Sequence, residues 1–117
     1  MNRKELGAKA ESLACKFLAR KGLQVIERNF RCSAGEIDII AKDKTYIVVV
    51  EVRSTSTYSF HNPLDSFTPL KIERLKVLAQ IWLNCHGKDD AFIRFDIITV
   101  VFHAKNHNKI SYFKDAF

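Results

Sequence analysis

One segment near the middle of the chain is apolar on both of its faces. Residues 47–50 read Ile-Val-Val-Val, and Val52 continues the run after a single acidic residue, Glu51. β-Branched residues favour strands, and successive residues of a strand point to opposite faces of its sheet. A strand that is apolar on both faces must be covered on both faces. We therefore expect residues 47–53 to form a central strand in a sheet flanked by helices.

Two other segments carry apolar residues at helical spacing. The first is preceded by Asn2, which with Glu5 three residues later resembles a capping box, and it should stop at Gly22. The second should begin after Thr68 as its N-cap and end before Gly87. Both helices are amphipathic, so each should cover part of the sheet.

The remaining apolar segments are typical of strands. They span residues 25–30, 36–41, 92–102 and 110–113, the last at an edge of the sheet. Residues 54–67 are polar, and we expect a long loop there. The first three strands should form a meander, and the order α-β-β-β-α-β favours an α+β or mixed α/β fold. A chain of 117 residues is the size of one domain, so we expect a single domain over residues 1–117.

The composition restricts the class of protein. Hydrophobic residues make up 47% and charged residues 27% of the chain, which excludes a disordered chain. No apolar run approaches the roughly 20 residues of a membrane helix. The net charge of +6 favours a polyanionic partner. Cys15, Cys32 and Cys85 are scattered, which indicates free thiols and a reducing, cytoplasmic setting.

Two carboxylates interrupt the apolar strands. Asp38 is flanked by isoleucines and Glu51 by valines. An ionised carboxylate in such surroundings is costly to desolvate and needs a partner. Strict alternation would put Asp38 on one face with Glu36 and Ile40. Neighbouring strands lie about 4.8 Å apart, so Asp38 and Glu51 would converge if their strands pair and their faces agree, although the sequence does not fix the register.

Converging carboxylates favour a cation between them. Mg²⁺ or Mn²⁺ suits oxygen ligands, and we expect Asp38 and Glu51 to hold it, with the Val52 carbonyl as a further ligand. Glu11, at the margin of the first helix's apolar stripe, would bind directly or through water. Arg53, on the same face as Glu51, would clamp a phosphate. Such a site is suited to phosphodiester hydrolysis.

Plainer interpretations stay open for these residues. Glu51 and Arg53 could belong to an ordinary ion-pair network, and Asp38 could cap a backbone group or pair with Arg28 or Arg31. Lys71 and Arg74 on the second helix could contact phosphates or form a solvated face. Further hypotheses concern three loop residues and one strand acid, namely His61 as a proton donor, Tyr58 and Phe60 as stacking surfaces for an extruded base, and Asp96 as a partner of Arg94.

Several motifs, in the same order along the chain, resemble the YraN family. The carriers are Gly7 with Glu11, residues 28–31 (Arg-Asn-Phe-Arg), 35–40 (Gly-Glu-Ile-Asp-Ile-Ile), 50–53 (Val-Glu-Val-Arg), Lys71 with residues 74–75 (Arg-Leu), 94–96 (Arg-Phe-Asp) and 116–117 (Ala-Phe). That family is similar to the restriction-endonuclease-like, PD-(D/E)XK superfamily, near the Holliday-junction resolvases. The resemblance implies a central mixed sheet flanked by helices.

The resemblance also implies roles for individual residues. Asp38 matches the superfamily's Asp, Glu51 its Asp/Glu, and Glu11 the acidic residue of the first helix. Arg53 stands at the position of the motif's Lys, to which a role in orienting or deprotonating water is usually given. This is a departure, because an arginine remains protonated and cannot act as a base, although it can stabilise charge on a phosphate.

The sequence thus predicts a nuclease-like protein that hydrolyses phosphodiester bonds of nucleic acid with Mg²⁺ or Mn²⁺. DNA is the expected substrate, and RNA is the alternative. A catalytically inactive nucleic-acid-binding module on the same fold is the first alternative. A protein-interaction scaffold with an exposed apolar patch is the second. Related resolvases cut as dimers, which leaves a homodimer open.

Overall fold

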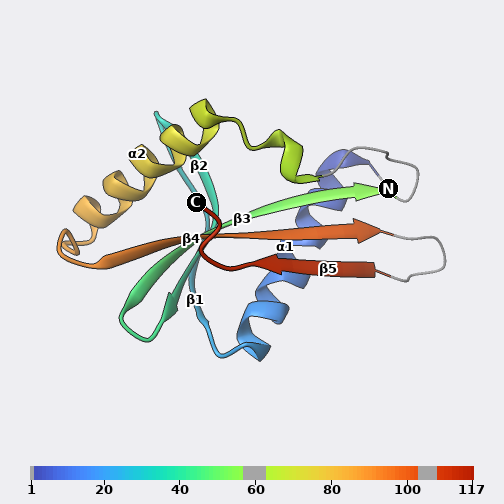
Figure 1. Ribbon diagram of the computed structural model, residues 1–117, viewed down its shortest axis with the longest axis horizontal. Helices are drawn as coiled ribbons and strands as arrows, with labels where there is room; N and C mark the ends of the chain where they lie inside the picture. Colours follow the sequence, from blue (N-terminus) through green and yellow to red (C-terminus); the bar gives the residue numbers. More distant parts are fainter. Residues whose placement is uncertain (1, 57–62, 103–107) are drawn as a thin grey trace.

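The computed structural model describes residues 2–56, 63–102 and 108–117 (Figure 1). Its elements are the helices α1 (Arg3–Arg20) and α2 (Pro69–Cys85), the short 3₁₀ helix η1 (Pro63–Ser66), and the strands β1 (Gln24–Cys32), β2 (Gly35–Asp43), β3 (Tyr46–Ser56), β4 (Phe92–Phe102) and β5 (Asn108–Phe113). One mixed sheet carries a helix on each face, so the expected mixed α/β class is confirmed.

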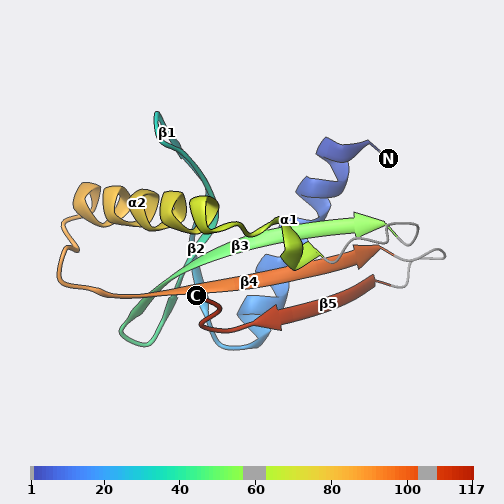
Figure 2. The ribbon, with the colours of Figure 1, turned by 45° about the horizontal axis from the view of Figure 1, so that its top comes forward.

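The strands lie in the order β1-β2-β3-β4-β5, which puts β3 at the centre as predicted. The meander β1-β2-β3 is antiparallel, β3 and β4 are parallel, and β5 returns antiparallel to β4. Parallel neighbours need a crossover connection, and α2 lies in the one between β3 and β4. The tip of the β1–β2 hairpin projects beyond the rest of the sheet (Figure 2).

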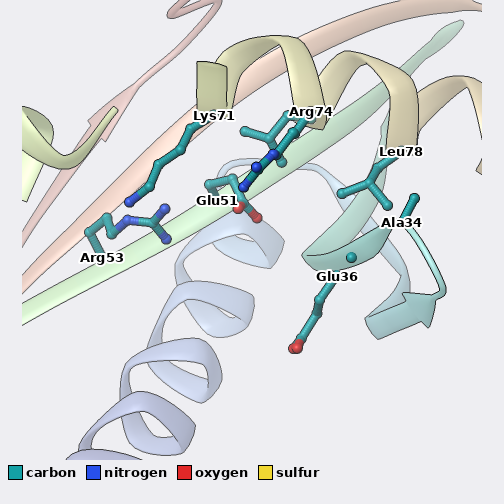
Figure 3. A pocket seen from close by; sticks show the side chains of 9 residues that line it. Ala34, Glu36, Glu51, Arg53, Lys71, Arg74 and Leu78 are labelled. Atoms are coloured by element: carbon teal, nitrogen blue, oxygen red, sulfur yellow. The ribbon is translucent and has the colours of Figure 1, made fainter. Parts of the chain in front are cut away.

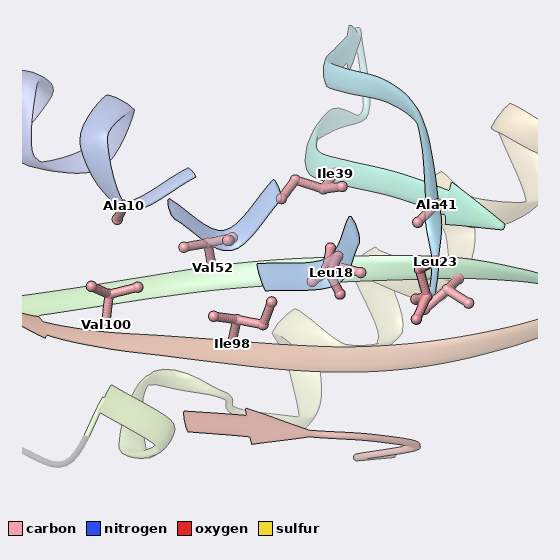
Figure 4. Packing of buried hydrophobic residues seen from close by; sticks show 11 residues of the cluster. Ala10, Leu18, Leu23, Ile39, Ala41, Val52, Ile98 and Val100 are labelled. Atoms are coloured by element: carbon pink, nitrogen blue, oxygen red, sulfur yellow. The ribbon is translucent and has the colours of Figure 1, made fainter. Parts of the chain in front are cut away.

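Two apolar clusters explain why β3 is apolar on both faces. Val48, Val50 and Val52 pack toward α1, together with its residue Leu18 (Figure 4). On the other face, residues 47 and 49 pack under α2 against its buried leucines and tryptophan. Each helix therefore buries its apolar stripe on one face of the same strand.

The ends of the helices follow the predicted capping signals. The Asn2 side chain accepts a hydrogen bond of 2.8 Å from the Glu5 N–H, and the Thr68 hydroxyl accepts one of 3.2 Å from the Lys71 N–H. Gly22 follows α1 with a φ of 90°, a conformation that glycine adopts without strain. Neither helix among the described residues has the length and apolarity that crossing a bilayer requires.

The polar segment after the central strand is more ordered than expected. β3 continues to Ser56, because β4 is long enough to pair with it up to Phe102. Residues 63–66 then form η1 before α2 begins. The prediction of a loop over residues 54–67 is therefore wrong at both ends of that segment. Tyr58, Phe60 and His61 lie outside the described residues.

Candidate functional site

The strands β2 and β3 part at the two acidic residues. Their pairing runs regularly from Asp43 opposite Tyr46 to Ile39 opposite Val50, a register that puts Asp38 opposite Glu51. At that point, backbone N–H groups of the two strands donate to carboxylate side chains instead of to carbonyls of the neighbouring strand. The Asp38 N–H donates to Glu51 Oε2 at 3.1 Å, and the N–H of the next β3 residue, 52, donates to Asp38 Oδ2 at 2.8 Å. The structure therefore brings the two carboxylates together where the sheet opens.

Strict alternation along β2 fails at this point. Ile37 and Ile40, three residues apart, both pack in the cluster under α2, so the face assignment of Glu36, Asp38 and Ile40 predicted from alternation is wrong. In β1, Asn29 lies between the residues that pair with Ile39 and Ile37 and has a φ of 55°, so the neighbouring strand is also irregular at this point. Because Asp38 accepts a hydrogen bond from a backbone N–H of β3, its carboxylate lies near the plane of the sheet rather than on one face.

Burial sets the protonation of the acidic pair. Glu51 is only 7% exposed, and this burial, with the negative charge of Asp38 added to it, raises the pKa of Glu51 to about 8. Burial also raises the pKa of Asp38, while the hydrogen bond from the Val52 N–H and the charge of Arg53 oppose that rise. Glu51 therefore holds a proton at neutral pH when no cation is bound. A cation bound between the two acids would replace this proton and hold both carboxylates ionised.

Arg53 is held in one orientation beside this pair. Its Nη1 lies 4.0 Å from Asp38 Oδ2 and donates to the Val52 carbonyl at 3.2 Å. Its Nε donates to Ser66 Oγ at 3.0 Å, and its guanidinium lies 4.5 Å from the centre of the Phe67 ring. Three different elements thus fix the cation that the sequence predicts as a phosphate clamp. The carbonyl predicted as a metal ligand already accepts a bond from this arginine.

A pocket of about 230 Å³ opens over Glu51 on the α2 side. Arg53 from β3 and Lys71 from α2 point toward one another, and Arg74 extends from α2 to Glu51 (Figure 3). The remaining lining comes from the hairpin tip and from α2, namely Ala34, Gly35, Glu36, Leu75 and Leu78. The pocket is smaller than the roughly 300–1,000 Å³ of drug-sized ligand sites, and its three cations suit a small anionic group.

Glu11 lies on the other side of the sheet opening. Its side chain is 18% exposed, with Oε1 at 4.0 Å from Arg28 Nη2. Burial raises its pKa most, and the charge of Asp38 raises it further. Within residues 2–56, 63–102 and 108–117, no three His, Cys, Asp or Glu side chains gather closely enough to hold a metal ion. The structure therefore brings together Asp38, Glu51 and Arg53 but does not gather Glu11 into one group with the two other acids.

The plainer alternatives are resolved in part. Asp38 does accept a backbone N–H, as one alternative has it, and it also lies beside Arg53. Arg31 pairs instead with Glu36 at 3.2 Å. Arg53 is also held by Ser66 and Phe67, which no sequence pattern predicts, because a serine and an aromatic residue in a polar segment carry no signal of that contact.

A second polar cluster is buried on the α1 side of β4. Arg94 donates to both carboxylate oxygens of Asp96 at 3.0 Å and to Asp43 at 2.9 Å, so the predicted pairing of Asp96 with Arg94 is confirmed. The Tyr112 hydroxyl and the Asp115 N–H also donate to Asp96. This cluster attaches the chain after β5 to the sheet. In the sequence, the sign of this cluster is that Arg94 and Asp96 stand two positions apart in an otherwise apolar strand.

Comparison with known proteins gives one consistent result. The model of the uncharacterised protein family UPF0102 matches residues 10–100. A UPF0102 protein of Streptomyces griseus is 43% identical over 97 residues, covering 82% of both chains. Others from Caldicellulosiruptor saccharolyticus and Clostridium perfringens are 37% and 40% identical, covering 100% and 97% of this chain and 100% and 94% of their own.

Proposed function

The chain belongs to the UPF0102 family, and we propose that it is a metal-dependent nuclease that hydrolyses phosphodiester bonds of nucleic acid, DNA in the first place. The observation that carries this proposal is the meeting of Asp38 and Glu51 at the sheet opening, with Arg53, Lys71 and Arg74 around the adjoining pocket. Acids that can hold a cation then lie beside cations that can hold a phosphate.

The acidic pair fits a divalent ion. Glu51 is buried and Asp38 is half-buried, and the pKa values of both are raised, so a nearby positive charge would stabilise their ionised forms. Mg²⁺ or Mn²⁺ binds one or two carboxylates together with water and phosphate oxygens. Asp38 and Glu51 would hold the ion, and Glu11 would act at most through water, since it lies outside the pair. When bound, a divalent ion polarises the phosphodiester and lowers the pKa of a bound water.

The basic residues have separate tasks in this proposal. Arg53 stays charged and cannot take a proton from water, so it clamps the scissile phosphate and stabilises the negative charge that develops there. Its bonds to Ser66 and to the Val52 carbonyl fix the direction of the guanidinium before substrate binds. Lys71 and Arg74 hold the flanking backbone from α2. Hydrolysis then adds the water oxygen to phosphorus and breaks one ester bond, whose oxygen takes a proton.

The fold supports a finer assignment within the same proposal. The central mixed sheet with a helix on each face agrees with the architecture that the resemblance to the restriction-endonuclease-like superfamily implies. The motif resemblance to the YraN family is consistent with the family match. We carry over from that resemblance the roles of Asp38 and Glu51, and we treat Arg53 as its departure.

Cleavage assays test the proposal. Purified protein is incubated with branched, duplex and single-stranded DNA in Mn²⁺, Mg²⁺ or chelator. We expect metal-dependent cleavage that Asp38→Asn and Glu51→Gln abolish, while Glu73→Gln, an exposed acid on α2, leaves it unchanged. Cleavage that persists in both site variants would contradict the proposal.

A nucleic-acid-binding module without catalytic activity is the second candidate. The observation that favours it is Arg53, a permanent cation that is tied to Val52, Ser66 and Phe67 at the place where a base would be needed. This candidate predicts binding that weakens with salt but no cleavage in any divalent metal. Arg53→Ala would then weaken binding, whereas Glu51→Gln would leave binding at neutral pH unchanged, because Glu51 is already protonated there.

A further inference from the structure

We propose that a second, aromatic pocket beside Arg53 binds one unpaired base of the nucleic-acid strand, so that the substrate is single-stranded or locally unpaired. This inference rests on the proposed function for the presence of a nucleic acid. The pocket lies between η1, the first turn of α2 and the segment after β5, and its volume is about 430 Å³. That volume falls within the range of small-molecule sites, unlike the smaller pocket over Glu51.

Aromatic side chains form much of its wall. Phe67, Phe113 and Phe117 line it, with aliphatic side chains between them and Lys114 at its edge. Phe113 is 38% exposed although it is a large apolar residue. An exposed aromatic ring such as that of Phe113 stacks on bases without regard to sequence, because every base has a π-face.

Phe67 connects the aromatic pocket to the phosphate clamp. The Arg53 guanidinium lies 4.5 Å from the centre of the Phe67 ring, which also lines the aromatic pocket. A phosphate at Arg53 and a base in the aromatic pocket would therefore be separated by little more than one ring, the kind of separation that a sugar spans within one nucleotide. Lys114 at the edge would meet a neighbouring phosphate.

The far wall is fixed before a ligand arrives. The Ala116 N–H donates to the Phe95 carbonyl at 2.7 Å, and the Phe117 ring stacks on Phe95 with centroids 5.6 Å apart. Phe117 also contacts Phe67 at 5.8 Å with an interplanar angle of 41°. A wall that needs no reorganisation loses little freedom when a base binds.

The occupant must be an unpaired base. A base inside a duplex is stacked and paired, and extruding it costs a few kcal/mol, least where the strand is already open. An aliphatic protein side chain would fill the pocket but would make no use of the cation at Arg53 or of Lys114. Both charges suit the phosphates on either side of a base.

A fluorescent base tests the pocket directly. Single-stranded DNA carrying 2-aminopurine is bound to the protein in chelator, with anisotropy of a terminal dye as an independent measure of binding. We expect the 2-aminopurine emission to fall on binding, because the base stacks. Phe113→Leu and Phe117→Leu should abolish that fall and weaken binding about fivefold or more, whereas Phe113→Tyr should preserve both. Phe92→Leu, an exposed phenylalanine at the start of β4, is the control and should behave as wild type.

The outcomes separate this inference from the proposed function. Binding with unchanged 2-aminopurine emission at every position, or equal emission changes in Phe113→Leu and wild type, would overturn the base pocket and leave metal-dependent cleavage unaffected. Stacking that needs Phe113 but occurs without cleavage in any metal would overturn the nuclease and leave the base pocket. Absence of any strand binding would overturn both.

Discussion

The fold opposes the negative charge of Glu51, so replacing this residue with a neutral one of the same shape should stabilise the protein. In Glu51→Gln the amide oxygen can still accept the Asp38 N–H, and the amide nitrogen can donate to the Asp38 carboxylate. Glutamine thus reproduces the protonated acid that occupies the wild-type pocket near neutral pH. The variant removes a titratable group and keeps the hydrogen bonds.

The expected magnitude follows from proton linkage. The pKa of Glu51 rises from its ordinary 4.5 to about 8 in the folded chain, so between these pH values the folded state holds a proton that the unfolded state has lost. The free energy of unfolding therefore falls by about 1.4 kcal/mol per pH unit as pH rises through this window. The stabilisation that comes from the proton on folded Glu51 is therefore fully present below pH 4.5. At most about 5 kcal/mol of this stabilisation is lost by pH 8.

Urea unfolding at pH 4.5, 6 and 8 measures this difference. Trp82, the single tryptophan, is buried and reports the transition. We expect Glu51→Gln to match wild type at the lowest pH and to exceed it by several kcal/mol at pH 8, with Glu73→Gln as the exposed control. Mn²⁺ should stabilise wild type more than Glu51→Gln. Equal pH slopes for the two proteins, or a less stable variant at pH 8, would refute this account of the acidic pair.

Three further changes test the fold around the site, each by urea denaturation. Arg94→Leu leaves Asp96, which is 1% exposed, without its cation, and should cost about 3–5 kcal/mol, part of which Arg94→Leu with Asp96→Leu should restore. Asn2→Ala removes the N-cap of α1 and should cost about 1 kcal/mol, while a loss near zero would show that the cap is dispensable. Gly35→Ala forces a Cβ to 3.3 Å from Leu78 Cδ1 at a φ of +139°, which should cost about 1–3 kcal/mol, and an unchanged midpoint would argue against that strain.

The elements could be predicted because their signals are local. Helical spacing, capping residues and stop glycines indicate helices, and short apolar runs between turn residues indicate strands, and all of these signals depend on a few neighbours along the chain. Within the described residues, the α-helices and the strands follow them. The central place of β3 also follows from its own residues, since only a strand covered twice is apolar on both faces. The extension of β3 to Ser56 could not be predicted, because it depends on the length of a partner strand that is distant in sequence.

The candidate site could be predicted in its residues but not in its construction. Acids in apolar strands identify Asp38 and Glu51, whereas alternation along β2 fails between Ile37 and Ile40, beside the irregular residue Asn29 of β1. The contacts of Arg53 with Ser66 and Phe67 depend on tertiary packing of η1, for which no local pattern exists.

The chemistry at the sheet opening exceeds what the fold alone requires. Where β2 leaves β3, the N–H groups of Asp38 and Val52 lose their ladder partners, and a buried donor without a partner costs about 1–3 kcal/mol. An amide side chain would satisfy each donor equally well and would bury no charge. The chain instead carries two carboxylates whose pKa values are both raised, an arrangement that lowers stability as pH rises. Groups whose environment opposes their charge in this way are concentrated at functional sites, where stability is given up for chemistry. Greater stability together with lost activity in Glu51→Gln would be the direct sign of that exchange.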